Sequence, residues 1–151
     1  MSDMKESLAR HPFLKDLKAS HVELLAECAA GAHFKKGGHM FHQGEKADRL
    51  YLIEEGKVGI RLEMPPHDPL TIMTLGPGGV AGWSWLFPAQ QWQFDVWVIE
   101  DTGAIVLNAD CVFAKCRQDY ELGFELMWRC SHIMADRLTA TRLQLLNTWG
   151  P

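Results

Sequence analysis

A glycine-rich segment, residues 76–94, carries the first candidate chemistry. It contains Gly78, Gly79 and Gly82, and it has three tryptophans but no Lys, Arg, Asp or Glu. Closely spaced glycines let successive backbone N–H groups point into one concavity, which suits an anion. The indole rings and neutral side chains suit an apolar or aromatic ligand instead. The segment therefore predicts a small-ligand cradle without charged side chains.

Histidines offer a second candidate chemistry, a metal site of the cupin kind. His39 and His42 are three residues apart, and side chains at that spacing face opposite sides of an extended strand. The two rings therefore diverge unless the chain bends. Glu45 lies close by, but no strand histidine follows His67, which sits in a Pro-Pro-His-Asp-Pro turn. We expect solvated histidines here rather than metal ligands.

The sequence offers no positive case for catalysis. It has no P-loop, no paired carboxylates and no Ser-His-Asp grouping, and Gly82–Trp83–Ser84–Trp85 is not a G-x-S-x-G nucleophile elbow. With 151 residues the chain makes one domain, and its net charge of -4 argues against nucleic-acid binding through bulk electrostatics. We therefore expect a protein that is not an enzyme and does not bind nucleic acid directly.

The four cysteines are expected to be reduced. Cys28, Cys111, Cys116 and Cys130 show no C-x-x-C spacing, and the N-terminus has no apolar region typical of a secretion signal. No stretch approaches the ~20 apolar residues that span a bilayer. These features predict a cytoplasmic protein with free thiols and no membrane contact.

Helices are predicted before the strand-rich part of the chain. Ser20 and Glu23 have the spacing of a capping box, and an apolar stripe then runs to Gly31, a typical helix terminator. Residues 12–17 suit a shorter helical turn.

Residues 34–107 change to the period of strands. Val58, Ile60, Leu62 and Met64 alternate with Lys57, Gly59, Arg61 and Glu63. Residues 50–53 are predicted to pair with this strand as a hairpin across the turn at 54–57. Further short strands are indicated at 94–98 and 104–107, and frequent Gly and Pro turns favour a sandwich or barrel.

The C-terminal part is predicted to be helical. Asp110 can cap a short helix over 111–117, and a long helix follows over about 119–148. At 1.5 Å per residue the long helix extends ~45 Å, further than a small barrel can cover. Its apolar stripe comprises Leu122, Leu126, Cys130, Ile133, Leu138, Thr141 and Leu145. We expect a homodimer through this helix; the alternative is that the stripe packs along its own barrel.

Residues 34–60, FKKGGHMFHQGEKADRLYLIEEGKVGI, resemble the first half of a cyclic-nucleotide-binding domain, the jelly-roll sensor of catabolite-activator-type regulators. Leu75–Gly78 resembles the turn into the family's phosphate-binding cassette, and Gly82 matches the glycine inside it. The resemblance implies a mainly β jelly-roll barrel with flanking helices in a single domain 1–151. Its parts would be N-terminal helices at 1–33, the barrel at 34–107 and C-terminal helices at 108–151.

The sequence departs from the resemblance at both charged positions of the cassette. The family's Glu, which takes the ribose hydroxyl, is replaced by Trp83, and its phosphate-binding Arg falls at or near Gln93. Losing two charge-assisted contacts removes roughly 3 to 6 kcal/mol, or ~100- to 10,000-fold in affinity. The nearby Asp95 would also repel a phosphate. We therefore expect binding of cyclic AMP and cyclic GMP to be weak or lost.

The expected function is a ligand-sensing regulatory domain for some other small molecule, with no fixed cofactor. The candidate ligand-binding residues are Gly82, Trp83, Ser84, Trp85, Gln93, Phe94 and Thr141. Trp92 and Trp97 also offer stacking faces, although Trp97 suits the core. The alternatives are a scaffold whose pocket Trp83 fills, acting through dimer or protein contacts, or a metal or haem barrel. Haem-binding relatives imply His39, His42, Cys130 or His132 as an axial ligand.

The chain ends at residue 151 without room for the winged helix that follows this sensor in catabolite-activator-type regulators. The sequence is therefore either a stand-alone sensor or a piece of a longer regulator.

Overall fold

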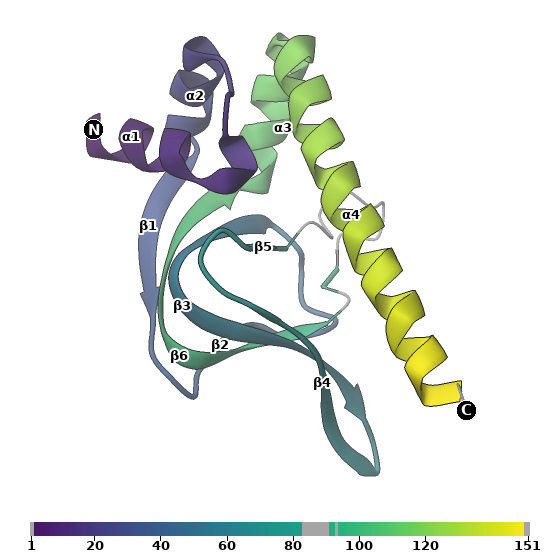
Figure 1. Ribbon diagram of the computed structural model, residues 1–151. Helices are drawn as coiled ribbons and strands as arrows, with labels where there is room; N and C mark the ends of the chain where they lie inside the picture. The colour runs from purple at the N-terminus through teal and green to yellow at the C-terminus, as the bar shows by residue number, and fades with distance from the viewer. Residues whose placement is uncertain (1, 83–90, 93, 150–151) are drawn as a thin grey trace.

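The computed structural model describes residues 2–82, 91–92 and 94–149. Figure 1 shows two N-terminal helices above one end of a strongly curved sheet, with a long helix running down beside it. The helices are α1 (Ser2–Arg10), α2 (Ala19–Ala26), α3 (Ala109–Gln118) and α4 (Tyr120–Trp149), with a 3-10 helix at Pro12–Leu14. Among the described residues, no helix combines the length and the apolar character that crossing a bilayer requires.

The strands form one antiparallel, jelly-roll-like barrel. They are β1 (Ala29–Phe34), β2 (His39–Phe41), β3 (Arg49–Met64), β4 (His67–Leu75), β5 (Val80–Ala81) and β6 (Asp95–Asn108). The sheet runs β1-β6-β3-β4, while β2 pairs with β6 and β5 with β3. The expected fold class is confirmed. The barrel begins at Ala29 rather than at residue 34 and ends one residue later than predicted.

The helix before the barrel has different ends from those expected. Its N-cap is Lys18, which makes no side-chain capping bond, so the predicted Ser20–Glu23 capping box is wrong. Ser20 already lies inside the helix, where it cannot act as the cap. The helix ends at Ala26, and the predicted terminator Gly31 lies in β1, paired with Ile105 of β6.

The predicted hairpin at residues 50–64 is also wrong, because these residues form the single 16-residue strand β3. Gly56 has φ +93°, and the register against β6 is irregular on both sides of it, with the pairs Ile53↔Ala104, Glu55↔Gly103, Lys57↔Glu100 and Val58↔Val98. A Cβ on Gly56 would lie 2.6 Å from the Cα of Thr102. The glycine therefore lets β3 bend closely against β6 instead of reversing the chain. The two short strands predicted at 94–98 and 104–107 are the two ends of β6.

The core lies between the barrel strands and the helices that cover its open end. Val58 and Ile60 of β3 are buried, as their alternation predicts. They pack in one cluster with Leu8 of α1, Leu25 of α2 and Leu122 of α4. Burial of these side chains holds the helices to the barrel.

The two C-terminal helices begin at side-chain caps. Asn108, not the predicted Asp110, caps α3, and its side-chain oxygen accepts a hydrogen bond from the Cys111 N–H at 2.9 Å. Asp119 precedes α4, and its Oδ1 accepts from the N–H groups of Glu121 and Leu122. These caps satisfy N–H groups that the first turns leave without helical partners. The long predicted helix is confirmed to within one residue at each end.

The apolar stripe of α4 is buried over its first half only. Leu122, Leu126 and Cys130 are buried, whereas Leu138 and Leu145 are 51% and 58% exposed. The stripe therefore packs into the domain's own core, beside α3, near the start of α4 and is uncovered further along.

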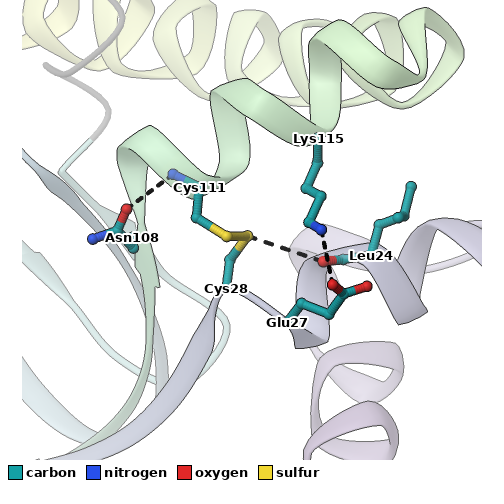
Figure 2. Close-up of a disulfide and its surroundings, with 6 residues drawn as sticks. All are labelled: Leu24, Glu27, Cys28, Asn108, Cys111 and Lys115. Carbon is teal, nitrogen blue, oxygen red and sulfur yellow. Dashed lines mark hydrogen bonds and ion pairs between the residues drawn. A yellow bond between two sulfur atoms is a disulfide. The ribbon is translucent and has the colours of Figure 1, made fainter.

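Two of the four cysteines are joined, which corrects the expectation of four free thiols. Figure 2 shows the disulfide between Cys28, just after α2, and Cys111 in the first turn of α3. Their Cα atoms are 5.5 Å apart. The two helices also meet through the Lys115 Nζ–Glu27 Oε1 ion pair at 2.8 Å. Packing of segments far apart in sequence, which spacing rules cannot show, brings these cysteines together. Cys116 and Cys130 are free.

Candidate functional site

The main candidate site is a cavity of about 500 Å³ between the sheet and α4. Its sheet side is formed by Ile60 and Leu62 of β3, Ile72 and Met73 of β4, and Phe94. Its helix side is formed by Met134, Arg137, Leu138, Ala140, Thr141 and Gln144 of α4. The volume is in the range usual for small-ligand sites, and most lining side chains are apolar.

A much smaller hollow of about 20 Å³ shares three residues with this cavity, Ile60, Phe94 and Arg137. Gly82 lies in its wall with φ +98°. A Cβ at Gly82 would come within 2.6 Å of the Arg49 carbonyl oxygen. The chain can therefore take this conformation only with glycine, which agrees with the match of Gly82 to the glycine inside the family's cassette.

The predicted nest of glycine amides is not formed at Gly78 and Gly79. The Gly78 N–H donates to the Ile53 carbonyl and the Gly79 N–H to the Gly76 carbonyl, both at 2.9 Å. These two amides are therefore used by backbone bonds rather than presented to an anion.

Arg137 brings a cation to the cavity. Its Nη2 donates a hydrogen bond to the Val80 carbonyl oxygen of β5, and the side chain lines both hollows. Burial lowers the pKa of Arg137 to about 10, although the nearby Cys130 acts in the opposite direction. The guanidinium is therefore still charged at neutral pH.

Sequence reasoning missed Arg137, although a signal was present. It stands seven residues after Cys130, on the same face of α4 as the buried part of the stripe. A charged residue at an apolar-stripe position is unusual enough to mark a site.

The residues predicted to bind ligand are only partly brought together. Phe94 lines both hollows, Gly82 lines the smaller one and Thr141 the larger. The Thr141 hydroxyl, however, donates to the Arg137 carbonyl of its own helix at 2.8 Å. The remaining predicted ligand residues, Trp83, Ser84, Trp85 and Gln93, lie outside the described residues.

Of the two other tryptophans considered as stacking faces, Trp92 has a different role from the one expected. Trp92 is in the core, 4% exposed, and stacks on Phe41 with ring centroids 3.8 Å apart. Trp97 is half-buried, with the Arg61 guanidinium 5.1 Å from its ring centroid. Trp92 therefore supports the barrel and offers no free face to a ligand.

Asp95 is held away from the site. It is 2% exposed, and its Oδ1 accepts a hydrogen bond from the Gln43 N–H at 2.6 Å. A hydrogen bond to Asp95 raises the pKa of Glu63. Asp95 is not among the described residues lining either hollow, so the expected repulsion of a bound phosphate is not supported.

The rings of His39 and His42 lie together, whereas the sequence predicted that they diverge. Their rings stack with centroids 4.4 Å apart; β2 is irregular between His39 and Phe41, where its register against β6 shifts, and it ends at Phe41. The His39 Nε2 lies 2.9 Å from the Arg61 Nη2. Burial, and then the charges of His42 and Arg61, lower the pKa of His39. Across the part of the chain that the structure describes, no group of three or more His, Cys, Asp or Glu side chains is arranged to hold a metal ion.

Comparison with known proteins identifies the family. The family described as "Cyclic nucleotide-binding domain" matches residues 32–119, which include most of the barrel, α3 and the turn into α4. The chain belongs to this family. The resemblance seen in residues 34–60 is thereby confirmed, and cyclic-nucleotide-binding domains of this type are regulatory units.

The relatives of this cyclic-nucleotide-binding domain are longer proteins. It is 25% identical over 142 residues to a CRP-like cAMP-activated global transcriptional regulator of Mycobacterium tuberculosis, covering 94% of this chain and 62% of the regulator. It is 31% identical over 102 residues to the cAMP-activated global transcriptional regulator CRP of Salmonella typhimurium, covering 68% of this chain and 47% of that regulator. The chain thus spans about half to three fifths of the length of these relatives.

A solved structure confirms the fold independently. The cyclic nucleotide-binding domain from Methylobacillus flagellatus superposes with a TM-score of 0.81 at 18% identity, covering 97% of this chain and 83% of that one. At this identity the likeness concerns the fold alone. The family's barrel and its long C-terminal helix are therefore both present in this chain.

Proposed function

We propose that this cyclic-nucleotide-binding domain is a non-catalytic sensor of a small ligand other than cyclic AMP or cyclic GMP. The observation that carries the proposal is the largely apolar cavity of about 500 Å³ between the sheet and α4. A ligand held there would contact β3, β4 and α4 together. Occupancy would therefore change how firmly α4 is held against the barrel.

The sequence of the cassette supports the exclusion of ordinary cyclic nucleotides. Trp83 and Gln93 replace the Glu and Arg that the family uses for the ribose and the phosphate. Most of the described side chains that line the cavity are apolar, so the sugar hydroxyls and base nitrogens of a nucleotide would find few polar partners there. Polar groups buried without partners lower affinity strongly.

The uncovered part of α4 supports a role in passing on the signal. Its exposed apolar side chains include Leu138, Leu143, Leu145 and Leu146. A second copy of α4 or a protein partner would cover them, and Leu138 also lines the cavity. Ligand binding and association would thus share one helix.

These exposed side chains also favour a second candidate function. The domain could act as a scaffold that associates through α4 whether or not a ligand is present. The bulk of tryptophan at the position of the family's Glu, known from the sequence alone, supports this alternative.

Calorimetric titration with cyclic AMP and cyclic GMP, followed also by tryptophan emission, tests the proposal. We expect no saturable binding below millimolar concentration. The double variant Trp83→Glu/Gln93→Arg should gain binding, because it restores the two charged contacts. Micromolar binding by the unaltered chain would contradict the proposal. Failure of the double variant to gain binding would favour the scaffold instead.

A further inference from the structure

We propose that the cavity between the sheet and α4 binds an apolar molecule bearing one carboxylate, and that Arg137 pairs with this carboxylate. This inference rests on the proposed function and narrows its ligand to a chemical class.

The walls of the cavity select the apolar body. Ile60 and Leu62 of β3 lie on the sheet side, and Met134 and Leu138 lie on the helix side. Each methylene group that leaves water for such surroundings raises affinity about 4-fold. Methionine adapts its shape to irregular aliphatic or aromatic bodies. The body of the ligand is therefore hydrocarbon-like.

The position of Arg137 selects the anionic group. Arg137 is the one charged residue among the described residues that line the cavity and the small hollow at Gly82, and it belongs to the lining of both. The Nη2 bond to the Val80 carbonyl anchors the guanidinium to β5. A guanidinium carries five N–H donors in a planar fork, so it can donate to a carbonyl and to a carboxylate together.

The electrostatics of the site favour the same assignment. Burial lowers the pKa of Arg137 to about 10, which reflects the penalty of removing this cation from water. A carboxylate beside it would offset that penalty, whereas an amine would add a second positive charge.

The other polar side chains of the described lining explain why a single anionic group suffices. The Thr141 hydroxyl donates to the Arg137 carbonyl, and the Gln144 Nε2 donates to the Ile72 carbonyl at 3.1 Å. Both side chains are engaged with backbone, so a ligand rich in hydroxyl groups would find poor partners on these walls.

Calorimetric titration of the whole chain with octanoate, 1-octanol and octylamine at neutral pH tests this inference. The three probes share one hydrocarbon body and differ in charge. We expect octanoate to bind at least about 10-fold more tightly than 1-octanol, and octylamine most weakly. Arg137→Met should reduce octanoate binding by a similar factor and leave 1-octanol unchanged. Arg142→Met, which removes an exposed arginine of the same helix, should change neither.

The outcomes separate this inference from the function on which it rests. Equal binding of octanoate and 1-octanol would overturn the carboxylate but keep the cavity as a ligand site. A preference for octanoate that survives in Arg137→Met would overturn the assignment to Arg137. Binding of none of the probes would overturn both the ligand class and the proposed cavity. Should Arg137→Met fail to fold, Arg137→Lys retains the charge without the fork, and weaker octanoate binding with unchanged 1-octanol binding supports the pairing.

Discussion

At the scale of single residues, His11 is a buried group whose two ring nitrogens are both occupied. It is 4% exposed; its Nε2 lies 2.9 Å from the Ile53 carbonyl oxygen and its Nδ1 accepts from the Phe13 N–H at 3.2 Å. This pattern requires the neutral ring, with the proton on Nε2. Burial lowers the pKa of His11, although the Ile53 carbonyl and Glu54 favour the charged form.

We expect His11 to make the fold sensitive to acid. Because its folded pKa lies below the unfolded value of 6.5, the unfolded chain binds more protons in between. The stabilisation is complete above 6.5 and is lost as pH falls towards the folded pKa. We expect the free energy of unfolding, measured with urea, to fall between about pH 7.5 and about pH 5.5. The fall should be smaller for His11→Gln than for the unaltered chain. Equal losses would assign the effect to another group, such as His39.

Gly56 is a residue where the bend of β3 leaves no room for a side chain. Gly56→Ala should lower the free energy of unfolding by about 3 kcal/mol or more, from positive-φ strain and the clash with Thr102. Gly37→Ala is the matched control, since Gly37 also has positive φ but no neighbour within 4 Å of the added Cβ. Its loss should be about 1 kcal/mol. Similar losses in urea unfolding would mean that the contact with β6 is unimportant.

At the scale of elements, the disulfide joins the end of α2 to α3. The Cys28→Ser/Cys111→Ser variant should lose about 4 kcal/mol, because the bond closes a long loop in the unfolded chain. Unfolding of the unaltered chain, but not of this variant, should respond to dithiothreitol. Unfolding of the control variant Cys116→Ser, which keeps the disulfide, should still respond to dithiothreitol. Thiol titration of the denatured, unreduced protein should find two free thiols, and four would contradict the bond.

The elements also show what the sequence could and could not predict. Alternation found the barrel and helical periodicity found α4, because both patterns follow directly from burial on one face. The prediction of a hairpin at Gly56 was wrong because a glycine between two apolar runs looks the same in the sequence whether the chain turns back there or continues as a bent strand. Only pairing with β6, distant in sequence, decides between them.

The sequence pointed to some of the residues that line the candidate cavity and its small neighbour, and not to others, for a related reason. The cassette glycine Gly82 and Phe94 were found because they lie in a recognisable segment. Arg137 was not predicted, because it lies outside that segment and its reach into the cavity depends on how α4 packs. The sequence shows a charged residue at a stripe position of α4, but it does not show the cavity that this side chain lines.

At the scale of the whole molecule, the exposed half of α4 leads us to expect a homodimer. Leu145→Glu should shift the protein to the monomer in sedimentation experiments, because a charge would be buried in the interface. Asn147→Glu places the same exposed charge about 200° away on the helix and should leave the dimer intact. A protein that is monomeric without substitution, or dimeric with Leu145→Glu, would contradict this role of α4.

The position of the disulfide has a topological consequence. Cys28 precedes β1 and Cys111 follows β6, so every described strand lies inside one covalently closed ring. The helices lie in the two tails outside the ring, except for the first turn of α3. A single cut in a barrel loop, such as trypsin would make at the exposed Lys35 or Lys36, opens this ring without dividing the molecule. The two pieces separate only when a thiol reduces the bond. The barrel is therefore part of a covalent macrocycle, and a single cut in it leaves the two pieces joined as long as the disulfide stays oxidised.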